Sequence, residues 1–114
     1  MEDIEKKVKD ITVAIELDTL EKLDQEAFRR SMALSPLIRE ILMDYLNRNW
    51  DKKFVITPEK QMYLARTGSR YVKVRLTPRQ YNLLKAYATK NNIPMSHVIK
   101  IAVAEALGIL PKDE

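Results

Sequence analysis

Residues 70–78, RYVKVRLTP, combine the two patterns that decide the fold. Apolar and polar side chains alternate along the first seven positions, which predicts a short strand with one buried face. Thr77-Pro78 follows directly, and Gln80 stands three residues after the threonine, as in a helix-capping box. We therefore expect a half-buried strand that runs into a capped helix.

The two faces of this strand differ in chemistry. One face carries apolar residues that suit a core: Val72, Val74 and Leu76. The other presents a phenol, an ammonium and a guanidinium at alternating positions: Tyr71, Lys73 and Arg75. Long hydrogen-bond donors on an exposed strand face are the residue types that read base edges in a DNA groove.

Two helical patterns follow the strand. The first ends at Asn91-Asn92, because asparagine tolerates the left-handed backbone that stops helices. The second has a wide apolar face and ends at Gly108 and Pro111. The resulting order is strand, helix, turn, helix.

The same order occurs earlier in the chain. The segment ITVAI (11–15) alternates, a helical pattern follows it, and residues 31–36 interrupt the helix. Ser35 is expected to cap the next helix, with Pro36 in its first turn. The halves align without a gap at a spacing of 61 residues, so that Val13 matches Val74. An internal duplication of one β-α-α unit is the economical interpretation.

The expected fold class is α+β, mainly α with short strands, in which a two-stranded antiparallel ribbon packs on helices. A segment with Trp50 and a short helix capped by Thr57 separates the halves, and Gly68-Ser69 is the expected hinge before the second strand. The predicted organisation is a first repeat with an N-terminal arm (1–46), a structured linker (47–69), a second repeat (70–110) and a tail (111–114).

Each strand needs a partner for its backbone groups. The two strands pair within one chain, or each pairs with its equivalent in a second chain and forms a homodimer or a higher oligomer on DNA. We favour the intramolecular ribbon, since a linker of about 20 residues spans a small domain. Either ribbon fits the major groove of B-DNA.

Five segments resemble the ribbon-helix-helix family of Arc-type and Met-repressor-type DNA-binding regulators. They are ITVAI (11–15), LEKLD (20–24), SPLIRE (35–40), VKVRLTP (72–78) and SHVIK (96–100). Tandem versions occur in this family, among conjugative-plasmid DNA-processing proteins and archaeal viral regulators. The resemblance implies two repeats of the family's unit and a double-stranded DNA partner.

The resemblance also implies site residues. Outward strand residues read bases, which by match are Tyr71, Lys73, Arg75 and Thr12. Asp10 and Ala14 are expected to be bystanders. The start of each second helix, with the strand end, contacts phosphates; by match these residues are Ser35, Ser96, His97 and Arg70. Helix capping is the competing interpretation for both serines, and charge compensation at the helix end is the one for Arg29 and Arg30.

Composition narrows the function classes. The chain has no Cys and a single His, which argues against a metal site, and no motif pairs a nucleophile with a base. We therefore expect neither catalysis nor a cofactor. The absence of a long apolar run favours a cytoplasmic protein without a membrane partner. Residues 1–46 contain seven Lys/Arg and eleven Asp/Glu, whereas residues 47–114 contain thirteen and five, so the second part suits a polyanion.

The leading hypothesis is a sequence-specific regulator of transcription, a repressor or an activator. One alternative is an accessory protein that bends or organises DNA for a plasmid or virus. Another is an antitoxin-like protein-interaction module, for which the acidic first repeat and the short tail give weak support.

Overall fold

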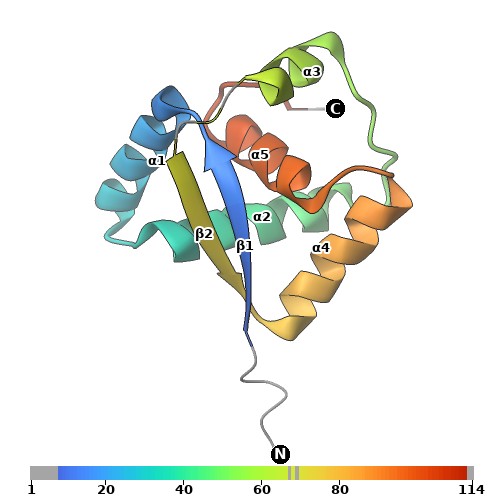
Figure 1. The fold of residues 1–114 in the computed structure, drawn as a ribbon, viewed down its shortest axis with the longest axis horizontal. Helices are drawn as coiled ribbons and strands as arrows, with labels where there is room; N and C mark the ends of the chain where they lie inside the picture. Colours follow the sequence, from blue (N-terminus) through green and yellow to red (C-terminus); the bar gives the residue numbers. More distant parts are fainter. Residues whose placement is uncertain (1–7, 67, 69, 113–114) are drawn as a thin grey trace, which may run out of the picture.

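The computed structural model describes residues 8–66, 68 and 70–112. Their elements, in chain order, are β1 (Lys9–Ile15), α1 (Leu17–Arg30), α2 (Leu34–Asn49), α3 (Pro58–Ala65), β2 (Arg70–Leu76), α4 (Pro78–Lys90) and α5 (Met95–Ala106). Five helices and one two-stranded sheet in this part of the chain confirm the mainly helical α+β class. Figure 1 shows both strands crossing in front of α2 and α5.

The two strands pair antiparallel within the chain, which is the pairing that we favoured from the sequence. Their alternation sends β-branched and aliphatic side chains to one face and polar ones to the other, as expected. The register places three pairs on the exposed face: Asp10 opposite Arg75, Thr12 opposite Lys73, and Ala14 opposite Tyr71.

Both halves of the chain contribute to a single core. The inner ribbon face buries Val13 and Val74 completely. Helix α2 packs against β2, helix α5 packs against β1, and the two helices pack against each other. Each half therefore covers the strand of the other, and neither half has a separate core.

The helix starts partly confirm the sequence predictions. Thr77 forms the predicted capping box with Gln80, and Thr57 caps α3. The prediction that Ser35 and Ser96 cap helices was wrong. Helix α2 is preceded by Ala33 and α5 by Pro94, and neither has a side-chain cap. Both serines are the second residue of their helix, two positions after the cap.

A residue with a left-handed backbone conformation follows each of three helices. Asn92 has φ 58° after α4 and Gly108 has φ 77° after α5, so both predicted stops are confirmed. Ser31 has φ 56° and ends α1, with its N–H directed to the carbonyls of Ala27 and Phe28. The predicted interruption at residues 31–36 is therefore shorter in the structure, because α2 already begins at Leu34 and only residues 31–33 separate the helices.

The linker is ordered around α3, as expected. Trp50 and Phe54 are half-buried against the core. The buried hydroxyls of Tyr63 and Thr19 lie 3.0 Å apart and join α3 to the start of α1. At the expected hinge, Gly68 lies against Ala14, and Ser69 is outside the described residues.

Candidate nucleic-acid interface

The outer ribbon face consists of Asp10, Thr12, Ala14, Tyr71, Lys73 and Arg75. All four predicted base-reading residues lie on it and are exposed. Tyr71 is 77% exposed, although an aromatic ring on a strand usually packs against a neighbour. Apart from Ala14, which is half-buried and lies against Gly68, the residues of this face are therefore open to a large partner.

A cross-strand ion pair between Arg75 and Asp10 lies at one end of this face. Nε of Arg75 lies 3.1 Å from Oδ1 of Asp10, and Nη2 lies 3.4 Å from Oδ2. The hydrogen bond from Arg75 holds the pKa of Asp10 below its usual value, and the same bond raises the pKa of Arg75. Asp10, which we expected to be a bystander in base reading, thus occupies one edge of the Arg75 guanidinium.

Helix α2 holds the backbone of Arg75 in place. The N–H of Arg75 donates to Oγ of Ser35 at 3.0 Å, and its carbonyl accepts from Nη1 of Arg39 at 3.0 Å. Ser35 thus binds the ribbon instead of capping its helix. Sequence analysis missed Arg39, although its place one helical turn after Ser35 put both on one face of α2.

These groups surround a hollow of about 320 Å³ beside the outer ribbon face. Its lining residues are Asp10, Ser35, Pro36, Arg39, Lys73 and Arg75. Three cations therefore face one carboxylate at the first turn of α2. A helix start carries partial positive charge and N–H groups without an intrahelical partner, so an anionic oxygen is stabilised there.

The other predicted phosphate contacts lie outside this hollow. Ser96 and His97 occupy the first turn of α5 and are half-buried. Burial, followed by the nearby charge of Lys100, lowers the pKa of His97. Arg70 is exposed opposite Ile15, at the end of β2 that is remote from Arg75. The structure thus brings Ser35 and Arg75 together and leaves the other three outside this hollow.

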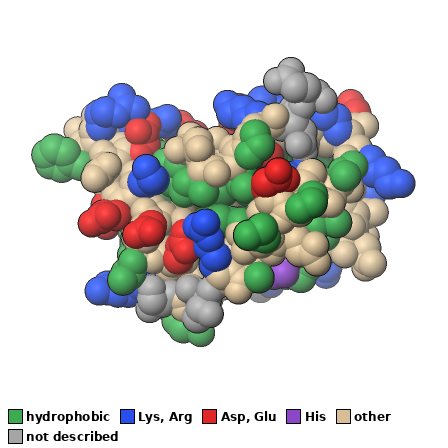
Figure 2. Space-filling view, turned by 90° about the horizontal axis from the view of Figure 1, so that it is seen from above, with side chains coloured by type: hydrophobic (Ala, Val, Ile, Leu, Met, Phe, Trp, Pro, Cys, Tyr) green, Lys and Arg blue, Asp and Glu red, His purple; other side chains and the backbone are tan. Residues whose placement is uncertain are grey.

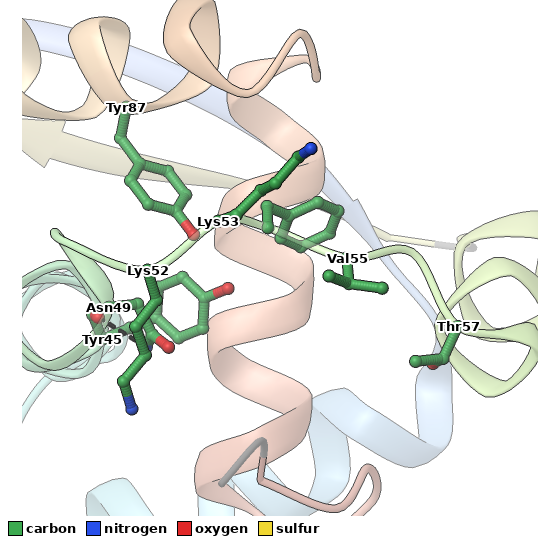
Figure 3. Close-up of a pocket in the computed structure, with 8 residues that line it drawn as sticks. Tyr45, Asn49, Lys52, Lys53, Val55, Thr57 and Tyr87 are labelled. Carbon is green, nitrogen blue, oxygen red and sulfur yellow. Dashed lines mark hydrogen bonds between the residues drawn. The ribbon is translucent and has the colours of Figure 1, made fainter.

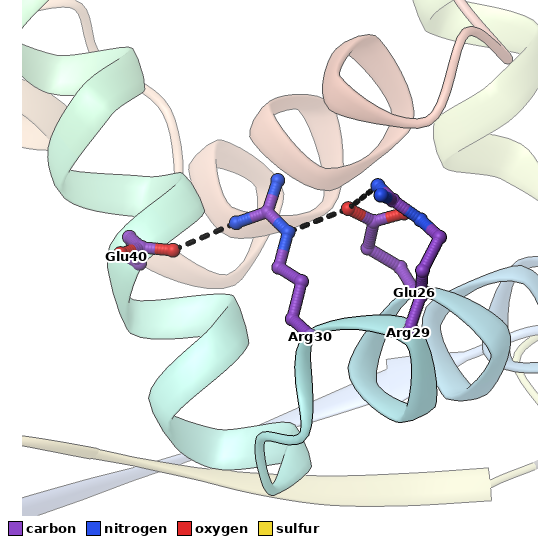
Figure 4. A network of polar contacts seen from close by, with 4 residues as sticks. All are labelled: Glu26, Arg29, Arg30 and Glu40. Carbon is purple, nitrogen blue, oxygen red and sulfur yellow. Dashed lines mark hydrogen bonds and ion pairs between the residues drawn. The ribbon is translucent and has the colours of Figure 1, made fainter.

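The cations at the end of α1 take part in an ion-pair network (Figure 4). Arg29 and Arg30 each lie 2.6 Å from Oε2 of Glu26, and Arg30 also reaches Glu40 of α2 at 2.8 Å. The bond from Arg29, then that from Arg30, lowers the pKa of Glu26. Both arginines lie in the last turn of α1, where they also offset the helix dipole.

A second hollow, of about 350 Å³, lies between α2, α4 and the segment before α3 (Figure 3). Tyr45 and Tyr87 form one wall with an edge-to-face contact at 6.0 Å, and Lys52 and Lys53 stand at its rim. None of the outer ribbon face residues lines it. Among the described residues, no three His, Cys, Asp or Glu side chains gather where they would hold a metal ion.

Figure 2 views the molecule from above relative to Figure 1 and shows acidic side chains gathered on the side of α1. That helix contributes Asp18, Glu21 and Asp24 to the surface. Three cations, in contrast, line the hollow beside the ribbon. None of the helices in the described part of the chain is both long and apolar enough to cross a bilayer.

No protein-family model, curated protein or solved structure matches the chain.

Proposed function

We propose that the protein binds double-stranded DNA by inserting the outer ribbon face into the major groove. The observation that carries the proposal is the exposed two-stranded ribbon with donors on alternate positions and a cationic helix start beside it. The major groove is about 12 Å wide and admits a two-stranded ribbon. Lys73 and Arg75 would read bases, with Thr12 and Tyr71 beside them.

We further propose that the chain is a tandem ribbon-helix-helix protein whose two β-α-α repeats form the ribbon. The register supports this interpretation. Thr12 and Lys73 stand opposite each other and are 61 positions apart, which is also the spacing of the matched halves. An approximate twofold axis through this pair then exchanges the other pairs on the face, so that Asp10–Arg75 and Tyr71–Ala14 occupy equivalent places.

The starts of α2 and α5 are the proposed phosphate anchors. Under the same twofold axis Ser96 corresponds to Ser35, and Lys100 corresponds to Arg39. Backbone N–H groups and the helix dipole would bind a phosphate at each anchor, while the cations add a salt-dependent attraction. Phosphate contacts would position the duplex and the ribbon would select its sequence. Occupying a chosen site is the means by which we propose that the protein regulates transcription.

Fluorescence anisotropy with a randomised duplex pool, and with the duplex enriched from it, tests the proposal across a salt series. The test variant is Lys73→Ala/Arg75→Ala. The matched control is Lys22→Ala/Lys85→Ala, which removes the same charge from exposed positions on α1 and α4. We expect the test variant to lose about tenfold or more of the preference for the enriched duplex, and the control to keep it.

The salt series separates the two kinds of contact. Residual binding of the test variant should keep a steep salt dependence, because the phosphate anchors remain. Failure of the wild type to enrich any duplex would overturn the proposal and favour a protein-interaction module. Equal preference in the wild type and the test variant would show that another surface reads the DNA.

A further inference from the structure

The two ends of the outer ribbon face differ chemically. At one end, Arg75 and Asp10 bring a guanidinium and a carboxylate together. At the other end, Tyr71 lies opposite Ala14, so that a phenol and a methyl group stand side by side. Since these pairs flank the central Thr12–Lys73 pair in the register, a duplex along the ribbon meets a different chemistry in each half of its site.

Asp10 leaves Arg75 able to read a base. The carboxylate accepts from Nε and Nη2, which form one edge of the guanidinium. A guanidinium has five N–H groups in a planar fork, so the edge between Nη1 and Nη2 still offers a pair of donors. Guanine O6 and N7 accept such a pair in the major groove. With its backbone held by Ser35 and Arg39, Arg75 is oriented by Asp10, not blocked.

Asp10 itself has acceptor capacity beyond this pair. An ionised carboxylate accepts about four hydrogen bonds, two of which go to Arg75 here. In the major groove it would accept from the exocyclic amino group of cytosine or adenine, and it repels the carbonyl oxygens of guanine and thymine. Its pKa, lowered by Arg75, keeps it ionised at neutral pH.

We infer that Asp10 is a specificity-determining residue, and that the ligand is an asymmetric duplex with a guanine at one end beside a base that presents an amino group to Asp10. Tyr71 and Ala14 offer apolar contact to thymine methyl groups at the other end. This inference rests on the proposed binding of DNA by the outer ribbon face. It goes further, because a ribbon with identical ends would read both half-sites alike.

The test measures binding to the enriched duplex and to duplexes with each base pair replaced in turn. The variants are Asp10→Asn and Asp10→Ala, with Asp24→Asn as a control that removes the same charge from an exposed position on α1. Since loss of an acidic group raises affinity for any duplex, only the relative cost of each base change is compared. Circular dichroism checks that each variant is folded.

We expect one base pair beside the contacted guanine to behave differently. Changing this pair so that a carbonyl oxygen faces Asp10 should cost the wild type and Asp24→Asn about tenfold in affinity, and Asp10→Ala less than about twofold. Asp10→Asn should lie between them, because its amide oxygen still accepts from an amino group. The same substitution profile in the wild type and both Asp10 variants would overturn the inference while DNA binding stands. Failure of the wild type to enrich any duplex would overturn the proposed function and this inference together.

Discussion

The hydroxyl of Ser35, at the start of α2, accepts a hydrogen bond from the backbone N–H of Arg75 at 3.0 Å. This bond joins the second residue of a helix in one half of the chain to the outer edge of a strand in the other. An edge N–H that would otherwise face solvent is satisfied by a side chain. The backbone of Arg75, which lines the hollow beside α2, is thereby held against the start of that helix.

Removing this hydroxyl should weaken both stability and recognition. We expect Ser35→Ala to lower the free energy of unfolding by about 1 kcal/mol, the usual contribution of one hydrogen bond. Urea denaturation measures the change, and anisotropy with the enriched duplex should show weaker binding. Ser96→Ala, at the matching position of α5, is the control and should alter stability less. An unchanged unfolding midpoint in Ser35→Ala would show that the bond contributes nothing.

The bond between Tyr63 and Thr19 should couple the linker to α1. The hydroxyl of Thr19 donates to Glu16, so Tyr63 donates to Thr19 in the buried contact. We expect Tyr63→Phe and Thr19→Val each to cost about 1 kcal/mol of unfolding free energy. The double variant should cost less than the sum, since either change breaks the same bond. Strict additivity in this double-mutant cycle would contradict the coupling.

Any side chain at position 68 should destabilise the protein. A Cβ at this position would lie 2.6 Å from the carbonyl carbon of Ala14, so backbone must move. We expect Gly68→Ala to lower the free energy of unfolding by about 1–3 kcal/mol. Ala14→Gly should not rescue it, because the carbonyl group of residue 14 remains. Thermal and urea unfolding of the single and double variants measure this, and full rescue would mean that only the Ala14 methyl group obstructs.

DNA binding should depend on pH through His97. Burial and Lys100 place its pKa in the free protein below the ordinary value of 6.5. A phosphate at the start of α5 favours the charged imidazole, so binding should take up a proton and strengthen as the pH falls through this range. We expect His97→Gln to flatten the pH dependence of the dissociation constant between about pH 5 and 7.

The stability of the free protein should depend on pH in the opposite direction to DNA binding, and fall as the pH falls. Because folding lowers the pKa of His97, the unfolded chain binds more protons near pH 6, and this residue's contribution to stability is lost as the pH falls. Unfolding of the wild type and His97→Gln at several pH values measures the difference. Identical pH profiles for DNA binding in the two proteins would remove His97 from the interface.

Local patterns predicted the strands and most helix limits. Period-two alternation identified the buried faces of both strands, and the Thr77–Gln80 spacing predicted a capping box that the structure contains. These features depend on residues within one turn or one strand. The interpretation of Ser35 as a cap failed because its partner, Arg75, is 40 residues away. Likewise, Asp10 lies 65 residues from Arg75, and only the strand register brings them together.

The most direct test of the central claim replaces single guanines of the enriched duplex by 7-deazaguanine, which lacks the N7 acceptor of the major groove and leaves the minor groove unchanged. At the guanine read by Arg75, we predict about a tenfold loss of affinity for the wild type and no further loss for Arg75→Ala. If the wild type binds every such duplex as tightly as the unmodified one, the ribbon does not read guanine in the major groove and the account is contradicted.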